Sequence, residues 1–355
     1  MKKNYTCICM AVCLLMCFTI SAQEVVDVAN TGLLNPIGIA KKDNDLFISS
    51  VGNASIQKKD LTDTSTTATT QYLQPVNFPT FIAFHGNDLY IPLLGANDSK
   101  VVKVDVTDPH DLLIDVVTNI TTPMGLAFRN DELYISLRQG AKVIKVDVTQ
   151  SNPTPVDVVT LIPGGLVNGI AFRGDELFIT HGTSISKVNV TDSNPVLTPV
   201  LTLEDGISHV AFHNDYLYFT QPSINTVARI DISQNIFVVD NFLTLDNDPW
   251  GMLVDGNDLY IAEQAGARVV RFDLSTLGVD EASKRTFTYY PNPTKDFLHI
   301  AGLENNTPFT LTDVHGKEII KGKLAATDKL DLSTIANGIY FLRLNTYEVK
   351  KIIKY

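Results

Sequence analysis

The segment GLAFRNDELYIS at residues 125–136 recurs in altered form six times along the chain, and this recurrence decides the fold. The six copies align on a shared leucine, which is Leu46, Leu89, Leu133, Leu177, Leu217 or Leu259. The steps between these leucines are 43, 44, 44, 40 and 42 residues. A period of this length that contains only strand and turn patterns is typical of β-propeller blades and not of helical solenoids.

Each repeat predicts the same succession of strands. The apolar run at 125–128 suits a buried inner strand, the Arg-Asn-Asp-Glu run at 129–132 suits a hairpin turn, and residues 133–136 alternate as a second strand. A third strand ends in Asp or Asn with Thr or Ser two residues later, as in Val-Asp-Val-Thr at 146–149. This Asp or Asn follows the shared leucine by 12 to 16 residues, so the length differences fall in the loop between the second and third strands.

The sixth repeat stops after its third strand, near Leu277. The fourth-strand pattern, seen in Pro-Val-Asp-Val-Val-Thr at 155–160, reappears at residues 24–29 as Glu-Val-Val-Asp-Val-Ala. We therefore expect the N-terminal strand to complete the last blade, which removes an open sheet edge. The predicted fold is all-β, with a six-bladed β-propeller over residues 24–277.

On this pattern the repeats resemble NHL-type and related six-bladed propellers. The resemblance specifies architecture and leaves activity open, because such propellers include metal-dependent lactonases, lyases and proteins that only bind peptides, glycans or other proteins.

Residues 1–23 read as a secretory signal peptide. Lys2 and Lys3 precede an apolar run at 8–20 that is too short to span a membrane, and cleavage is expected after Ala22 or Gln23. All four cysteines lie in this segment. Cys13 follows Val12 and Cys17 follows Met16, where lipidation requires a small residue. The mature chain should therefore have no disulfide, thiol nucleophile or lipid anchor, and no later run is long enough for a transmembrane segment.

The charge balance argues against nucleic-acid partners. The chain has 28 Lys and Arg against 39 Asp and Glu, a formal net charge of −11, and it contains no basic run.

A polar linker at 278–286 separates the repeats from a second small all-β module at 287–355. Its short motifs, in chain order, are Tyr-Pro-Asn-Pro, Asp-x-x-Gly-Lys, Gly-x-Tyr and a final Lys-Ile-Ile-Lys. They contribute the motif residues Pro291, Asn292, Pro293, Asp313, Gly316, Lys317, Gly338, Tyr340 and Lys351.

This module closely resembles the type A sorting domain of the type IX secretion system of Bacteroidota. The resemblance implies an immunoglobulin-like sandwich that engages the type IX secretion machinery. It also implies that the protein passes through the periplasm and is secreted or displayed on the cell surface.

Candidate ligand-binding residues follow from the positions at which the repeat is broken. In a propeller, the loops entering the inner strands and those joining second to third strands share one face around the channel, here called the channel mouth. The polar or aromatic residues predicted there are Asn168, His181, His209, Gln221, Trp250 and Glu263. The remaining positions include Ile37, Leu93 and Leu137, which make the other half of the face apolar.

The leading hypothesis is a noncatalytic binding protein for a glycan, peptide or partner protein, with no catalytic residue, cofactor or metal. The alternative is a metal-dependent lactonase or lyase that uses His181, His209 and Glu263, since His and Glu side chains bind metals and transfer protons. A purely structural adhesin component is a third possibility. The Asp that ends each third strand is expected to bind turn amides and not calcium.

Overall fold

The computed structural model describes residues 25–355 except 96–97, 109, 111, 162–164, 235, 277–287, 302–306, 315, 325–326 and 345–348. The predicted signal peptide, residues 1–23, and the predicted linker, residues 278–286, lie outside the described residues. Backbone contacts divide the chain into two units, Met1–Asp273 and Leu274–Tyr355.

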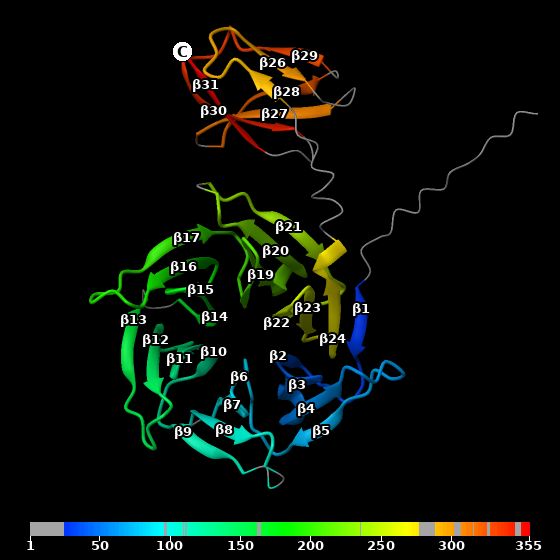
Figure 1. Ribbon diagram of the computed structural model, residues 1–355, viewed down its shortest axis with the longest axis vertical. Coiled ribbons are helices and arrows are strands. Elements are labelled where there is room, and N and C mark those ends of the chain that lie inside the picture. The colour runs from blue at the N-terminus through cyan, green and yellow to red at the C-terminus, as the bar shows by residue number, and fades with distance from the viewer. Residues whose placement is uncertain are drawn as a thin grey trace, which may run out of the picture. The chain divides into compact units, whose positions relative to one another are not determined.

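The first unit is a six-bladed β-propeller in which each blade is a four-stranded antiparallel sheet (Figure 1). Blades 1 to 3 contain β2 (Pro36–Lys42), β3 (Asp45–Ser50), β4 (Ser55–Asp60) and β5 (Thr70–Leu73); β6 (Ala83–His85), β7 (Asp88–Leu93), β8 (Lys100–Asp105) and β9 (Ile114–Val117); and β10 (Pro123–Arg129), β11 (Glu132–Leu137), β12 (Lys142–Asp147) and β13 (Val156–Thr160).

Blades 4 to 6 continue the pattern around the ring. They contain β14 (Val167–Arg173), β15 (Glu176–His181), β16 (Ser184–Asn189) and β17 (Thr198–Thr202); β18 (Val210–His213), β19 (Tyr216–Gln221), β20 (Thr226–Asp231) and β21 (Asp240–Thr244); and β22 (Pro249–Asp255), β23 (Asp258–Glu263), β24 (Arg268–Asp273) and β1 (Val26–Ala29). Short 3-10 helices lie at η1 (Val51–Asn53), η2 (Pro222–Ile224) and η3 (Leu274–Thr276).

The N-terminal strand closes the ring as predicted. β1 pairs antiparallel with β24, with Val26 opposite Arg271 and Asp27 opposite Val270. The last blade is therefore built from both ends of the propeller sequence, and Figure 1 shows β1 beside β24.

Adjacent blades are held together by aromatic contacts that recur with the repeat. The aromatic residue after the shared leucine packs edge-on against the aromatic that ends the inner strand of the next blade, as in Tyr90–Phe128 at 4.9 Å, Tyr134–Phe172 at 4.9 Å and Phe178–Phe212 at 5.0 Å. Such pairs are worth about 0.5–1.5 kcal/mol each beyond the area they bury. The repeat therefore encodes the blade interfaces as well as the blades.

The hairpin turns opposite the channel mouth carry a second set of contacts between blades. His85 lies 3.0 Å from Asp131, Arg173 lies 2.7 Å from Asp215, and Arg129 pairs with Asp175. Lys41 in blade 1 pairs with Asp255 in blade 6 at 2.8 Å. These pairs are largely exposed, so each contributes little by itself.

The second unit contains two facing sheets around one core, as in an immunoglobulin-like sandwich. One sheet contains β25 (Thr288–Tyr290), β26 (Phe297–Ala301) and β29 (Thr327–Asp331), and the other contains β28 (Glu318–Leu324), β27 (Thr307–Asp313), β30 (Gly338–Leu344) and β31 (Lys350–Lys354). Leu298, Leu311, Leu342 and Ile352 are fully buried between them.

Candidate functional site

The inner strands approach one another so closely at the channel that the repeat requires glycine there. Gly38, Gly125, Gly169 and Gly251 occupy the same position in blades 1, 3, 4 and 6. A Cβ atom at Gly251 would lie 2.0 Å from the carbonyl oxygen of Ile37 in the neighbouring blade. At the other three glycines a Cβ atom would lie 2.4 to 2.7 Å from the next blade's backbone.

Blades 2 and 5 break this glycine pattern with Phe81 and His209. These two blades face each other across a ring of six, and the two aromatic rings meet with their centroids 4.6 Å apart.

One half of the channel mouth is apolar. Ile37, Phe81 and Met124 form a buried cluster, against which Val51, Leu94 and Trp250 pack. Of the apolar residues predicted for this face, Ile37 belongs to this cluster, whereas Leu137 belongs to another core cluster and Leu93 packs against a third.

The other half contains polar side chains that lack partners. The Asn168 side chain donates from Nδ2 to the carbonyl oxygen of Ile207 at 3.2 Å, but its Oδ1 is buried without a hydrogen bond. Ser208 Oγ and His209 Nδ1 are likewise buried without partners among the described residues. Unpaired buried polar atoms are costly, and three of them in adjacent blades form a site with unused hydrogen-bonding capacity.

Burial also fixes the charge state of His209. Removal from water lowers the pKa of the imidazole to about 4, so His209 is neutral at pH 7. Nδ1 can then accept or donate a hydrogen bond, depending on the tautomer.

Hydroxyl groups hold this part of the backbone in place. Thr180 Oγ1 accepts from the Gly169 N–H at 2.8 Å and donates to the carbonyl oxygen of Ser208 at 3.0 Å. Thr220 Oγ1 accepts from the His209 N–H at 3.0 Å and donates to the carbonyl oxygen of Trp250 at 2.8 Å. Thus the second-strand hydroxyls of blades 4 and 5 each bind the backbone of their own blade and of the next, at Ser208 and Trp250.

Trp250 lies at the boundary between the two halves. Its indole Nε1 donates to Asp248 Oδ2 at 3.1 Å, which fixes the ring orientation. The guanidinium of Arg138, in the loop after β11, lies 6.0 Å from the ring centroid, close enough for a cation–π interaction. Burial lowers the pKa of Arg138.

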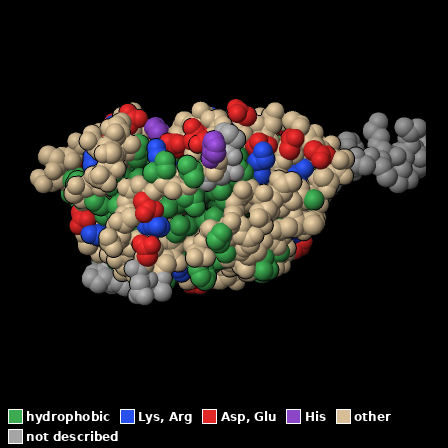
Figure 2. All heavy atoms as spheres, turned by 90° about the horizontal axis from the view of Figure 1, so that it is seen from below, with side chains coloured by type: hydrophobic (Ala, Val, Ile, Leu, Met, Phe, Trp, Pro, Cys, Tyr) green, Lys and Arg blue, Asp and Glu red, His purple; other side chains and the backbone are tan. Residues whose placement is uncertain are grey.

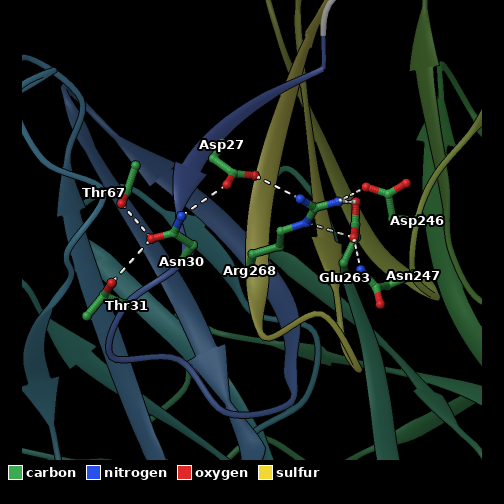
Figure 3. A network of polar contacts seen from close by, with 8 residues as sticks. All are labelled: Asp27, Asn30, Thr31, Thr67, Asp246, Asn247, Glu263 and Arg268. Atoms are coloured by element: carbon green, nitrogen blue, oxygen red, sulfur yellow. Dashed lines mark hydrogen bonds and ion pairs between the residues drawn. The ribbon is translucent and has the colours of Figure 1, made fainter.

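Glu263 occupies a separate ion-pair network, shown in Figure 3. Its side chain is fully buried, and Oε2 accepts from Arg268 Nε at 2.9 Å and from Asn247 Nδ2 at 2.9 Å. Arg268 also reaches Asp27 of the closing strand at 3.2 Å and Asp246 at 3.1 Å. The carboxylate that the sequence places at the mouth thus contributes to closure of the ring.

His181 and Gln221 lie at the ends of β15 and β19. His181 Nε2 lies 2.9 Å from Ser186 Oγ, and burial lowers the pKa of its imidazole. Gln221 is 3 % exposed. Within the described residues no hydrogen bond connects either side chain to Asn168. The neighbour of Asn168, Gly169, lies close against the backbone of His209 in the next blade.

The Asp or Asn that ends the third strand accepts turn hydrogen bonds in blades 1 to 5. In Asp105, Oδ1 accepts from both the N–H and the hydroxyl of Thr107, at 2.9 and 2.6 Å. Equivalent pairs occur at Asp60, Asp147, Asn189 and Asp231. These bonds lower the pKa of Asp60, Asp105 and Asp147.

No group of three or more His, Cys, Asp or Glu side chains suited to a metal ion occurs in the described part of the chain. On the face drawn in Figure 2, acidic and basic side chains are mixed, and hydrophobic side chains lie among them. None of the helices among the described residues has the length and apolar character needed to cross a membrane.

In the sorting motif, Asn292 holds the last strand. Its Nδ2 donates to the carbonyl oxygen of Lys351 at 2.8 Å, and its Oδ1 accepts from the N–H of Ile353 at 2.8 Å. Asn292 thus pairs with β31 as a neighbouring strand would, and the prolines on either side, Pro291 and Pro293, fix the backbone around it.

The other motif residues build turns and core. Asp313 accepts at Oδ1 from the Lys317 N–H at 3.0 Å, and Gly316 has a positive φ of 81° that the turn requires. Gly338 begins β30, in which Tyr340 is buried and donates its hydroxyl to the carbonyl oxygen of Ala336 at 2.8 Å.

Sequence reasoning missed three residues of the mouth: Phe81, Ser208 and Arg138. Phe81 and Ser208 could have been found by aligning every repeat on the glycine position, because Phe81 replaces the glycine and Ser208 is the register equivalent of Trp250. Arg138 gives no such signal, since it lies in a loop of variable length.

Residues 288–355 match the family of secretion system C-terminal sorting domains. No curated protein matches the chain. Several solved structures resemble the propeller, among them the following three. The PQQ-bound aldose sugar dehydrogenase of Streptomyces coelicolor has 18% identity and a TM-score of 0.56, covering 70% of this chain and 98% of that one.

The virginiamycin B lyase of Staphylococcus aureus has 13% identity and a TM-score of 0.52, covering 71% of this chain and 98% of that one. A chain of the nidogen/laminin complex has 15% identity and a TM-score of 0.51, covering 61% of this chain and 83% of that one. At these identities the likeness shows the fold alone. The chain is a six-bladed β-propeller whose C-terminal module belongs to the secretion system C-terminal sorting domain family, and it is exported by the type IX route to the cell surface or the medium.

Proposed function

We propose that the exported propeller binds an extracellular glycan, peptide or protein partner at its channel mouth. In this proposal residues 1–23 are the signal peptide that directs the chain to the periplasm, and residues 287–355 are the signal read by the secretion machinery. The propeller at 24–277 is the functional cargo.

The observation that carries the proposal is the division of the channel mouth into an apolar half and a half with unused hydrogen-bonding capacity. Trp250 packs on the apolar cluster of Ile37, Phe81 and Met124, while Asn168, Ser208 and His209 each keep a buried polar atom unpaired. Ligand sites typically combine an apolar surface with a few polar groups in this way. By contrast, the repeated Asp and Asn side chains at the ends of the third strands bind turn groups within their own blades.

A metal-dependent lactonase or lyase is the second candidate. Its support is the neutral imidazole of His209, whose Nδ1 lacks a hydrogen-bond partner among the described residues, although the lowered pKa makes it a weak base at pH 7. The carboxylate it would need from Glu263 is already bound by Arg268 and Asn247. A solved lyase and a chain of the nidogen/laminin complex both share this fold, so the fold does not choose between the two functions.

The test is a glycan and peptide array probed with the full mature protein, followed by Trp250→Ala and by His85→Ala on the opposite face as the matched control. We expect binding that Trp250→Ala weakens at least tenfold and His85→Ala leaves unchanged. Binding that His85→Ala weakens and Trp250→Ala leaves unchanged would refute the proposal. Metal analysis of the same sample discriminates the second candidate: about one divalent ion per chain would favour the enzyme.

A further inference from the structure

We propose that Arg138 recognises a single carboxylate on the ligand, so that the partner bound at the channel mouth carries one carboxylate beside an apolar or ring-shaped body. This inference rests on the proposed function and adds the chemical class of the ligand.

The first argument is that Arg138 differs from every other cation of the propeller. Residues 24–277 contain 15 Lys and Arg against 30 Asp and Glu. Ion pairs with carboxylates occupy Lys41, Lys58, Lys100, Lys103, Arg129, Lys142, Lys145, Arg173, Lys187, Arg229, Arg268 and Arg271. Lys42 and Lys59 donate to backbone carbonyl oxygens. Arg138 alone has no carboxylate or carbonyl partner for its side chain among the described residues.

The second argument is its place. Arg138 is half-buried beside Trp250, and the removal of its guanidinium from water lowers its pKa. A partly buried charge without a counter-ion is unfavourable, and in an acidic domain it could have been paired easily. A ligand that brings an anion to this point would recover that cost.

The third argument concerns the form of the anion. The guanidinium presents a planar fork that matches a carboxylate in a bidentate pair. A polyanion would be repelled by the twofold excess of acidic residues in the propeller, whereas a single carboxylate would not be repelled to the same degree. Trp250, which is only partly buried beside the guanidinium, then offers an aromatic surface for an uncharged body.

The chain provides its own reporter for the experiment, because Trp250 is its only tryptophan. The full mature protein is titrated with phenylacetate and with its neutral isostere phenylacetamide, and with D-glucuronate and D-glucose, while indole fluorescence is recorded. We expect each carboxylate to bind roughly tenfold or more tightly than its neutral partner. In Arg138→Gln this preference should disappear, and in Arg173→Gln, whose guanidinium is paired on the opposite face, it should remain.

A second readout separates recognition from a structural role. Arg138→Gln should raise the thermal midpoint of the unliganded protein, whereas Arg229→Gln, which breaks a pair with Asp240, should lower it. The proposal is overturned if charged and neutral probes bind equally, if no carboxylate binds, if inorganic phosphate binds better than the carboxylates, or if Arg138→Gln lowers the midpoint. Array binding that depends on Trp250 but not on Arg138 would overturn this inference and leave the proposed function standing.

Discussion

The ring of Phe81 lies against the imidazole of His209 across the channel, with the two centroids 4.6 Å apart. Both residues occupy positions at which four other blades have glycine. Blades 2 and 5 therefore have a side chain at the position where the other blades need glycine, and these two side chains contact each other. This contact links the apolar and polar halves of the channel mouth.

Phe81→Ala should destabilise the propeller by about 3 kcal/mol, because it removes a 3 % exposed aromatic side chain and leaves a cavity beside Ile37 and Met124. The free energy of unfolding in urea measures this, with Trp250 fluorescence as the signal. Leu112→Ala is the control, since Leu112 is 65 % exposed. Equal effects of the two changes would show that Phe81 does not support the channel.

Stability should fall as the pH is lowered from about 6.5 to about 4 because of His209. Its pKa is about 4 in the folded protein and about 6.5 when unfolded, so the unfolded state binds the proton first. The stabilisation is complete above the unfolded pKa and is lost toward the folded pKa, with a total of about 3 kcal/mol. Aspartates such as Asp105, whose pKa is lowered, add their own loss only at more acidic pH.

The check is the free energy of unfolding at several pH values between 7 and 4, compared with His209→Phe. The variant should have a shallower dependence on pH in this range, because it lacks the imidazole. Parallel curves for the two proteins would contradict the assignment to His209.

Arg268→Gln should cost about 3 kcal/mol or more, since it leaves the fully buried carboxylate of Glu263 without its counter-charge. It also releases Asp27, which ties the closing strand to the last blade. Arg271 lies in the same strand as Arg268, and Arg271→Gln breaks only its exposed ion pair with Asp258. This change should cost less than about 1 kcal/mol. Urea denaturation of both variants measures the difference, and similar losses would mean that the buried network does not hold the ring closed.

The sequence predicts the propeller well because each blade is built from local patterns. The shared leucines, the hairpin turns and the Asp-x-Thr turns all lie within one repeat, and residues 24–29 fill the missing fourth strand by pattern alone. The aromatic contacts between blades 2 and 3, 3 and 4, and 4 and 5 also repeat, so aligning the copies is enough to place them.

The site is less predictable because its contacts join distant residues. Glu263 reads as a free polar side chain until Arg268 brings it together with Asp27, which is 241 residues from Arg268 in the sequence. Arg138 is identified only by the absence of a partner among the described residues, and a sequence does not show which carboxylates are already paired. Asn168 and His209 were predicted because they break the repeat, and each has a buried polar atom without a partner among the described residues.

Asn292→Ala should impair export while leaving the propeller folded. The change removes two hydrogen bonds of 2.8 Å to the backbone of β31, at a cost of about 2 kcal/mol within the sorting domain. The released strand contains Lys351, and a sorting signal whose last strand is loose should be read poorly by the secretion machinery. Immunoblots of the medium, the cell surface and the periplasm measure the partition, with Lys321→Gln as a surface control in the same domain. Periplasmic retention of Asn292→Ala alone supports this role, whereas export at the wild-type level would show that the machinery tolerates a loosened β31.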